Sequence, residues 1–323
     1  MRYQSITFTK VEQAELVWAE DDTALADDEV SGPTLYSLIS AGTELAGAYL
    51  RSRFPANPGY AAVFRVEEVG ANVGHIQPGD VLFCMGKHQS HQRVRAIDTV
   101  SVPDALPHHL APFCRLMSVT MTTLQTTLAR PPAQVLVTGL GPVGHLCAQV
   151  FRAYGYDVLA VDPLDQRRAW AERAGLENVL DHVPVDDPQR ARRIDLHIEC
   201  SGHEAAALDG CKIVKKGGEV ALVGAPWAQR ADVQAHALLR EIFFNYVILR
   251  SGWEWELPHH TQDFRRGSIF ANLSEALRLL ATGKVDVEGL YERLSPATCQ
   301  TVYQDLLHRR AGHLFQVFTW QAE

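Results

Sequence analysis

The sequence predicts an α/β protein with two domains, a β-rich domain and a doubly wound domain built on a parallel sheet. Its 323 residues exceed the roughly 100–200 residues of a typical single domain. Residues 1–115 are rich in short strand-like runs separated by Gly and Pro turns, which favours antiparallel or barrel-like β structure. After Pro131-Pro132, short apolar runs alternate with helical stretches, a pattern typical of a parallel sheet buried on both faces.

In the β-rich part, strand-like runs cover Ala61–Val69 and Val81–Cys84, and the tight turn Gln77–Asp80 precedes the second run. In residues 116–252, which we predict to form a nucleotide-binding domain, strands are expected at 135–138, 157–162, 195–200, 219–224 and 247–251. A helical stretch is expected to follow Gly144 and run through Ala153, and a second helix is expected at 165–174. Helices are expected at 272–282 and 296–307, a strand at 313–320, and an outer strand of the parallel sheet at 243–249.

Composition excludes several classes of function. The formal net charge of −8 lacks the cationic surface that a nucleic-acid partner needs. We expect no membrane partner, because no apolar run approaches the ~20 residues of a membrane span. The six cysteines are scattered without a CxxC pair, and the first residues lack a secretory pattern. The sequence thus predicts a cytoplasmic protein with reduced thiols that acts on a small molecule.

A glycine-rich loop carries the main functional signal. Gly139, Gly141 and Gly144 form a GxGxxG motif, completed by Pro142 and Val143, between a strand and a helix. These glycines allow a tight turn, a close backbone approach to a pyrophosphate, and close helix–strand packing. Asp162 ends the next strand about 20 residues later, where a carboxylate accepts hydrogen bonds from the adenosine ribose. The motif therefore predicts a dinucleotide-binding site.

The acidic residue also bears on the choice of cofactor. The carboxylate of Asp162 would repel the 2′-phosphate of NADP, so NAD is favoured. Arg167 and Arg168 follow a few residues later; they form either a solvated helix face or, for Arg167, a contact to the adenine or its ribose. Ligands in such sheets bind beyond the carboxyl ends of the strands, so the same site is expected to include Ser201, Gly202, Val223, Gly224, Ala225 and Ser251.

The order of these motifs resembles the medium-chain dehydrogenase/reductase superfamily, which contains zinc alcohol dehydrogenases and quinone reductases. The Pro78-Gly79-Asp80 turn comes first, then Gly139–Gly144 with Asp162, then Ile198–Gly202. The resemblance implies a GroES-like catalytic domain formed by residues 1–115 and 253–323, and a Rossmann domain formed by 116–252. The loop Ile39–Glu44, followed by a Pro-Gly-Tyr, resembles a zinc-free branch that includes bacteriochlorophyllide hydroxyethyl dehydrogenase. That substrate is not carried over.

The departures from the zinc-dependent members predict no zinc. Their catalytic cysteine is replaced here by Ser40 or Ala41, and their Gly-His-Glu has become Gly59-Tyr60-Ala61. Catalytic zinc needs about three protein ligands, and only Cys114 falls near an expected ligand position. The four-cysteine structural lobe is missing as well. The histidine pairs His88/His91, His108/His109 and His259/His260 could form a different metal site, but solvated or hydrogen-bonded histidines are the favoured interpretation.

Without a metal, hydride transfer to a carbonyl needs hydrogen-bond donors for the oxygen and a group that exchanges a proton. Tyr60 is the preferred proton relay, with Ser40 and Thr43 as further candidates; packing beside Gly59 is an equal alternative for Tyr60. Glu44 is expected to orient this loop, although pairing with an arginine or acting as a base is also open. Ser118 could contact the nicotinamide. Trp253 and Trp255 either wall the substrate pocket or belong to the core.

These residues predict a zinc-independent NAD(H)-dependent oxidoreductase that interconverts an alcohol and its ketone or aldehyde. One alternative is reduction of an activated double bond, as in quinone and enoyl reductases. Another is a regulatory protein that binds the cofactor without catalysis. The resemblance further implies a homodimer formed by pairing of the outer strand of the Rossmann sheet.

Overall fold

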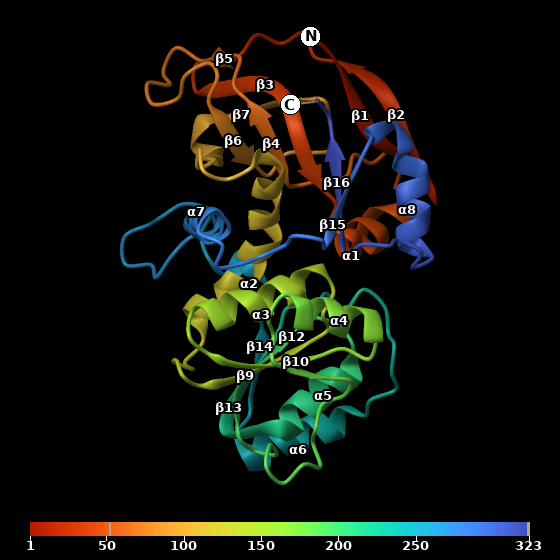
Figure 1. Cartoon of the computed structure of the whole chain (residues 1–323), viewed down its shortest axis with the longest axis vertical. Helices are drawn as coiled ribbons and strands as arrows, with labels where there is room; N and C mark the ends of the chain where they lie inside the picture. Colours follow the sequence, from red (N-terminus) through yellow and green to blue (C-terminus); the bar gives the residue numbers. More distant parts are fainter. Residues whose placement is uncertain (52, 322–323) are drawn as a thin grey trace. The chain divides into compact units, whose positions relative to one another are not determined.

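The computed structural model describes residues 1–51 and 53–321, and the chain forms two units (Figure 1). Unit 1 takes in the described residues of 1–115, 273–281 and 287–323, and unit 2 takes in 116–272 and 282–286. The sequence grouped all of 253–323 with the first unit, whereas 253–272 and 282–286 belong to unit 2. Hydrogen bonds explain the difference: Gln125 donates to Asn272, and the Asp286 amide donates to Gln149 at 2.8 Å.

The main sheet of unit 1 runs in the order β15-β16-β3-β4-β6-β8, with β5 and β7 also paired to β3, and β1 and β2 form a separate antiparallel hairpin. In the sheet, β16 pairs antiparallel with β3, so the end of the chain joins the N-terminal half. The strands are β1 Arg2–Lys10, β2 Gln13–Glu20, β3 Glu29–Leu38, β4 Ala62–Arg65, β5 Glu68–Val69, β6 Val81–Cys84, β7 His91–Arg95, β8 Thr99–Ser101, β15 Tyr291–Leu294 and β16 Phe315–Thr319.

Short helical segments connect these strands. The α1 turn follows β3 directly and continues as a π-helical turn, and α8 packs against β2. Their bounds are α1 Ala41–Glu44, the π-helical turn Leu45–Tyr49, 3-10 turns at Ala96–Asp98, His108–Phe113 and Pro296–Thr298, and α8 Cys299–Leu307. The rings of Phe8, Tyr49 and Tyr303 pack together with centroids 4.8–5.4 Å apart. This aromatic cluster supports the loop after β3 from inside the unit.

Unit 2 is built on a parallel sheet in the order β11-β10-β9-β12-β13-β14. The elements are α2 Cys114–Thr126, whose first two residues belong to unit 1, and β9 Gln134–Thr138, α3 Pro142–Ala153, β10 Asp157–Val161, α4 Asp165–Arg173, β11 Asn178–Leu180, β12 Ile194–Glu199, α5 Glu204–Ile213, β13 Val214–Leu222, α6 Ala235–Asn245, β14 Ile248–Ser251, a 3-10 turn at Glu254–Glu256, and α7 Ile269–Ala281, which continues into unit 1. Strands that alternate with helices in this way confirm the predicted α/β fold class.

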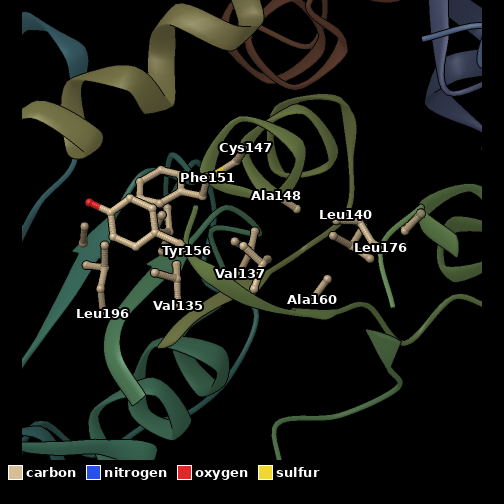
Figure 2. Packing of buried hydrophobic residues seen from close by; sticks show 14 residues of the cluster. Val135, Val137, Leu140, Cys147, Ala148, Phe151, Tyr156, Ala160, Leu176 and Leu196 are labelled. Carbon is tan, nitrogen blue, oxygen red and sulfur yellow. The ribbon is translucent and has the colours of Figure 1, made fainter. Parts of the chain in front are cut away.

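The alternation of side chains along the strands decides which helices cover which face. Val135 and Val137 of β9 point to the face covered by α3, where they pack with Phe151 (Figure 2). Leu136 points to the opposite face and packs in a cluster with Cys211 of α5. Successive strand residues face opposite sides, so a strand with apolar residues at every position is covered by helices on both sides.

One sequence prediction is wrong. Residues 243–249 were expected to form a strand, but Phe243–Asn245 are the last turn of α6. Tyr246 then adopts the left-handed conformation with φ 53° and ψ 30°, which ends the helix, and β14 begins only at Ile248. Aromatic and β-branched residues favour strands in general, and here helix α6 overrides that preference. Among the described residues, none of the helices is both long enough and apolar enough to span a bilayer.

We predict that Gly144→Ala lowers the free energy of unfolding by about 1–3 kcal/mol. A Cβ at position 144 would lie 1.9 Å from the carbonyl oxygen of Gly139, so the loop or the helix must shift. Gly141→Ala is the matched control, because its φ is −67° and its Cβ would lie 3.8 Å from the nearest atom. Urea unfolding of both variants checks the prediction, and equal midpoints for them would contradict it.

Candidate functional site

A cluster of hydroxyl groups lies where β3 ends and β4 begins in unit 1. Ser37 of β3 pairs with Ala62 of β4, so the residues just beyond these strand ends, Ser40 and Tyr60, come together. The Tyr60 hydroxyl donates to the Ser40 Oγ and also lies 3.5 Å from the Thr43 Oγ1. Ser40 is buried, Tyr60 is half-buried and Thr43 is exposed. The three hydroxyl groups therefore form a continuous path from the interior to solvent.

Next to this cluster lies the buried Glu44, whose carboxylate accepts hydrogen bonds from three groups. It accepts hydrogen bonds from the Ser40 amide at 2.7 Å, from the Tyr303 hydroxyl at 2.5 Å and from the His88 Nε2 at 3.1 Å. Burial alone would raise the pKa of Glu44, but the His88 ring, the Tyr303 hydroxyl and the Ser40 amide outweigh burial and lower it. This arrangement suits the orienting role expected for Glu44, because a carboxylate held by three donors is a poor base.

His88, which is fully buried, continues this network toward the end of the chain. Its Nδ1 lies 2.8 Å from the Ser37 Oγ, which in turn accepts a hydrogen bond from the Trp320 indole N–H at 2.9 Å. The other ring nitrogen bonds Glu44, so the network runs from Glu44 through the His88 ring to the Ser37 hydroxyl. Gly59 lies against His88, because a Cβ there would be 2.5 Å from the His88 amide nitrogen. The network thus fixes the backbone beside Tyr60.

Arg115, which sequence reasoning did not single out, lies beside Tyr60. Its side chain is buried, and its guanidinium carbon lies 4.6 Å from the centroid of the Tyr60 ring. Burial raises the pKa of the Tyr60 phenol, and the positive charge of Arg115 acts in the opposite direction. A charged residue within the apolar stretch Ala111–Val119 was the signal that could have identified it.

The potential metal ligands near Tyr60 in unit 1 are buried or already hydrogen-bonded. Burial raises the pKa of the Cys114 thiol well above its ordinary value, which disfavours the thiolate that binds metal. Both ring nitrogens of His88 already have partners, and the nearby guanidinium of Arg115 would repel a cation. Across residues 1–51 and 53–321, no group of three His, Cys, Asp or Glu side chains is arranged to hold a metal ion.

In unit 2, the glycine loop brings the ends of three strands close together. Gly139 has φ 83°, and a Cβ there would lie 2.8 Å from Ser201 after β12. Gly202 and Gly224 approach even more closely, since a Cβ on Gly224 would lie 2.2 Å from the Gly202 amide nitrogen. Gly141 stands at the N-cap of α3, with Pro142 and Val143 in its first turn. These close approaches fit a pyrophosphate held by backbone amides.

Asp162 lies directly after β10 and is buried. Its carboxylate accepts hydrogen bonds from the amides of Leu140 at 2.8 Å and Leu164 at 2.9 Å, and Arg167 lies 3.2 Å away. The Arg168 guanidinium donates to the Asp162 carbonyl at 2.8 Å. Asp162 thus connects the glycine loop to the start of α4, and Arg167 is placed beside this loop.

Glu199 is a further buried residue that the sequence analysis did not identify. Its carboxylate accepts from the amides of Ser201 at 2.7 Å and Gly202 at 2.9 Å, and from the Ser201 hydroxyl. Burial raises its pKa. Its backbone carbonyl accepts from the amides of Val223 and Gly224 at 2.8 and 2.6 Å. Glu199 therefore holds two of the predicted strand ends in shape. An acidic residue at the end of an apolar strand was the sequence feature that could have identified it.

The remaining predicted residues are more scattered within unit 2. Ala225 packs against Gly202, and the exposed Ser251 accepts a hydrogen bond from the Trp253 amide. Ser118 is buried in α2. Trp253 is exposed and Trp255 stacks on His259 at 5.1 Å, so neither tryptophan lies in the described core. In unit 1, His109 bonds the Tyr291 hydroxyl at 2.9 Å.

Comparisons with known proteins agree with this architecture. The family model of zinc-binding dehydrogenases matches residues 142–257. An alcohol dehydrogenase of Geobacillus stearothermophilus is 25% identical over 55% of this chain and 63% of its own length. Human sorbitol dehydrogenase is 27% identical over 57% of this chain and 63% of its own. The chain thus spans less than two thirds of the length of these relatives.

The solved structures extend the likeness to nearly the whole chain. Galactitol-1-phosphate dehydrogenase from Escherichia coli superposes with a TM-score of 0.84 at 16% identity, covering 98% of this chain and 99% of the other. A dehydrogenase from Sinorhizobium meliloti 1021, whose structure is bound to NADP, has a TM-score of 0.79 at 17% identity, with 99% of both chains covered. In sequence, residues 142–257 match the zinc-binding dehydrogenase family, and nearly the whole chain shares its fold with solved dehydrogenase structures.

We predict that Glu44→Gln lowers the free energy of unfolding at pH 7 by about 1–3 kcal/mol, because the buried donors around it lose a charged acceptor. The pKa of Glu44 is lower in the folded chain than its ordinary value of 4.5. Its stabilisation is therefore fully present above that value and is lost as the pH falls through the folded pKa.

Urea unfolding between pH 7 and pH 3.5 measures both effects. The wild type should lose stability below about pH 4.5 more steeply than Glu44→Gln, and exposed Glu20→Gln should behave like the wild type. Parallel pH profiles for Glu44→Gln and the wild type would contradict the assignment.

Proposed function

We propose that this protein is a zinc-independent, NAD(H)-dependent oxidoreductase that interconverts an alcohol and its ketone or aldehyde. The observation that carries the proposal is the Tyr60 hydroxyl group, which bonds Ser40 and lies 3.5 Å from Thr43. A group that can both donate and accept a proton is what alcohol–carbonyl chemistry requires when no metal activates the oxygen. The dehydrogenases among its relatives support the same class of reaction.

Unit 2 supports the cofactor half of the proposal. The glycine loop and Ser201, Gly202 and Gly224 would hold the pyrophosphate and the nicotinamide end, since glycines let the backbone approach a dinucleotide closely. The close backbone packing at Gly202 and Gly224 supports this placement, because it keeps these strand ends together. Asp162, paired with Arg167, would face the adenosine ribose and disfavour an added 2′-phosphate. The chemistry that a bound nicotinamide cofactor supplies is hydride transfer at carbon.

Unit 1 supports the proton half. In the reducing direction the Tyr60 hydroxyl donates its proton to the carbonyl oxygen, and in the oxidising direction Tyr60 takes the proton of the alcohol. Ser40 and exposed Thr43 lead the proton to solvent. Glu44 holds the Ser40 amide and keeps this loop in place. The Arg115 guanidinium and the fully engaged His88 favour organic groups over a metal ion here.

We expect the protein, treated with a chelator and free of zinc by elemental analysis, to oxidise NADH with at least one ketone or aldehyde, and NADPH more slowly. Tyr60→Phe should lower kcat about 100-fold or more with unchanged NADH affinity, because it removes the exchangeable proton. The matched control Tyr3→Phe should keep full activity. Absorbance at 340 nm, measured with a panel of carbonyl, enone and quinone substrates, checks these outcomes.

Other results would point to the alternatives. Turnover with enones or quinones alone would favour a double-bond reductase. Tight NADH binding by calorimetry with no turnover over the whole panel would favour a cofactor-binding regulatory protein. Activity that disappears with the chelator and returns with Zn²⁺ would overturn zinc independence, and Tyr60→Phe with full activity would remove Tyr60 as the proton relay.

We also propose that the chain forms a homodimer. β14 is the last strand in the order of its sheet, and such an edge invites pairing with another strand. Next to it, Phe243 and Phe244 are 75% and 59% exposed, and Tyr246 and Ile248 are exposed as well. Several exposed large apolar side chains within six residues favour a protein–protein interface. A second copy presents the same edge, so the two strands can pair about a two-fold axis.

Light scattering at micromolar concentration should give twice the mass of one chain for the wild type. The double variant Phe243→Asp, Ile248→Lys should give one chain mass, because two charges would be buried unpaired in the interface. Leu128→Lys, at an exposed position of the same unit, should remain a dimer. A monomeric wild type would refute the proposal.

A further inference from the structure

Arg115 is a buried cation beside the candidate proton relay. It lies in the first turn of α2, is 3% exposed, and places its guanidinium carbon 4.6 Å from the centroid of the Tyr60 ring. Both residues belong to unit 1. A guanidinium over an aromatic face is attracted by the electrons of the ring, and the attraction is stronger when water is excluded. Arg115 therefore fixes the orientation of the ring as well as its electrostatic surroundings.

The groups around the Tyr60 oxygen differ in what they do to its charge. Burial disfavours the negatively charged phenolate and raises the pKa of Tyr60, whereas Arg115 lowers it, followed by the hydrogen bonds of Ser40 and Thr43. Glu44, behind Ser40, acts weakly in the same direction as burial. Arg115 is thus the charged neighbour that favours a negative Tyr60 oxygen, and Ser40 and Thr43 are neutral.

We propose that Arg115 is a positioning residue that acts through Tyr60: its guanidinium holds the phenol ring and stabilises the negative charge that Tyr60 carries when its proton is on the substrate. This inference rests on the proposed function. During reduction, the O–H bond of Tyr60 breaks as a new O–H bond forms on the substrate oxygen, and the substrate carbon receives the hydride of the reduced cofactor. A proton from solvent, passed by Thr43 or Ser40, then restores the Tyr60 hydroxyl group.

The inference explains how this site works with organic groups. A metal ion in a dehydrogenase lowers the energy of a negative oxygen by its charge. Here the fixed guanidinium of Arg115 has a similar effect on the oxygen of Tyr60, the proton donor, rather than on the substrate oxygen itself. Lys at this position would keep the charge but not the flat contact with the ring, so it separates the two contributions of Arg115.

Titration of Tyr60 tests the inference without turnover. The protein is labelled with tyrosine carrying ¹³C at Cζ, and the Tyr60 signal is assigned by its loss in Tyr60→Phe. In Arg115→Met the titration midpoint of this signal should rise by about one pH unit or more, as expected when an opposite charge within 4–6 Å is removed. Arg115→Lys should fall between the two. Arg65→Met is the matched control: Arg65 is exposed and bonds the Gly79 carbonyl at 3.2 Å.

Kinetics provide the second readout. Arg115→Met should reduce kcat about tenfold and shift the limb of the pH–rate profile that reports Tyr60 upward by the same pH interval, with an unchanged KM for NADH. A merely structural role would lower the amount of folded protein and leave the titration midpoint in place. If Arg115→Met does not fold, the comparison of Arg115→Lys with the wild type decides.

The outcomes separate the two proposals. A Tyr60 midpoint that is equal in the wild type, Arg115→Met and Arg115→Lys overturns the role of Arg115, whatever the activity. If the Tyr60 midpoint differs between the wild type and the Arg115 variants, but the wild type turns over no substrate, Arg115 is supported as the residue that tunes Tyr60. The same result refutes the proposed oxidoreductase function.

Discussion

The buried carboxylate of Glu44 is the constraint on which unit 1 depends. A charge removed from water is tolerated only when hydrogen-bond donors surround it. The donors here come from segments far apart in the sequence: the Ser40 amide from the same loop, the His88 ring from the segment before β7, and the Tyr303 hydroxyl from α8. Completing this set requires the end of the chain to return to the β-rich part. The same bonds keep Ser40 where the Tyr60 hydroxyl can reach it.

Unit 2 depends on close contact between backbones. Gly144 sits so close to the Gly139 carbonyl that no side chain fits, and Gly224 approaches the Gly202 amide in the same way. Steric exclusion of side chains, rather than charge, determines which residues fit at these strand ends. Two buried carboxylates, Asp162 and Glu199, then bond the amides of the loops and hold them in shape. Unit 1 is thus organised by a buried carboxylate and its donors, and unit 2 mainly by close backbone packing.

Much of this arrangement could be predicted from local patterns. The strand–glycine loop–helix segment around Gly139, the acidic end of β10 and the alternation of strands with helices are encoded within short windows of sequence. Two predictions failed or fell short. Phe243–Asn245 continue α6 although their side chains favour strands. Residues 253–272 join unit 2 with Gln125 and Asn272 hydrogen-bonded.

By itself, the sequence determined the α/β fold class, the glycine loop with Asp162, and the presence of hydroxyl residues at Ser40, Thr43 and Tyr60, because backbone preference and side-chain chemistry are local properties. Only the tertiary structure decided that Arg115 lies on the Tyr60 ring, that Glu44 is saturated by His88 and Tyr303, and that Glu199 holds the turn after β12. Burial and charge pairing depend on which distant segments exclude water together, and that information is absent from any short stretch of the chain.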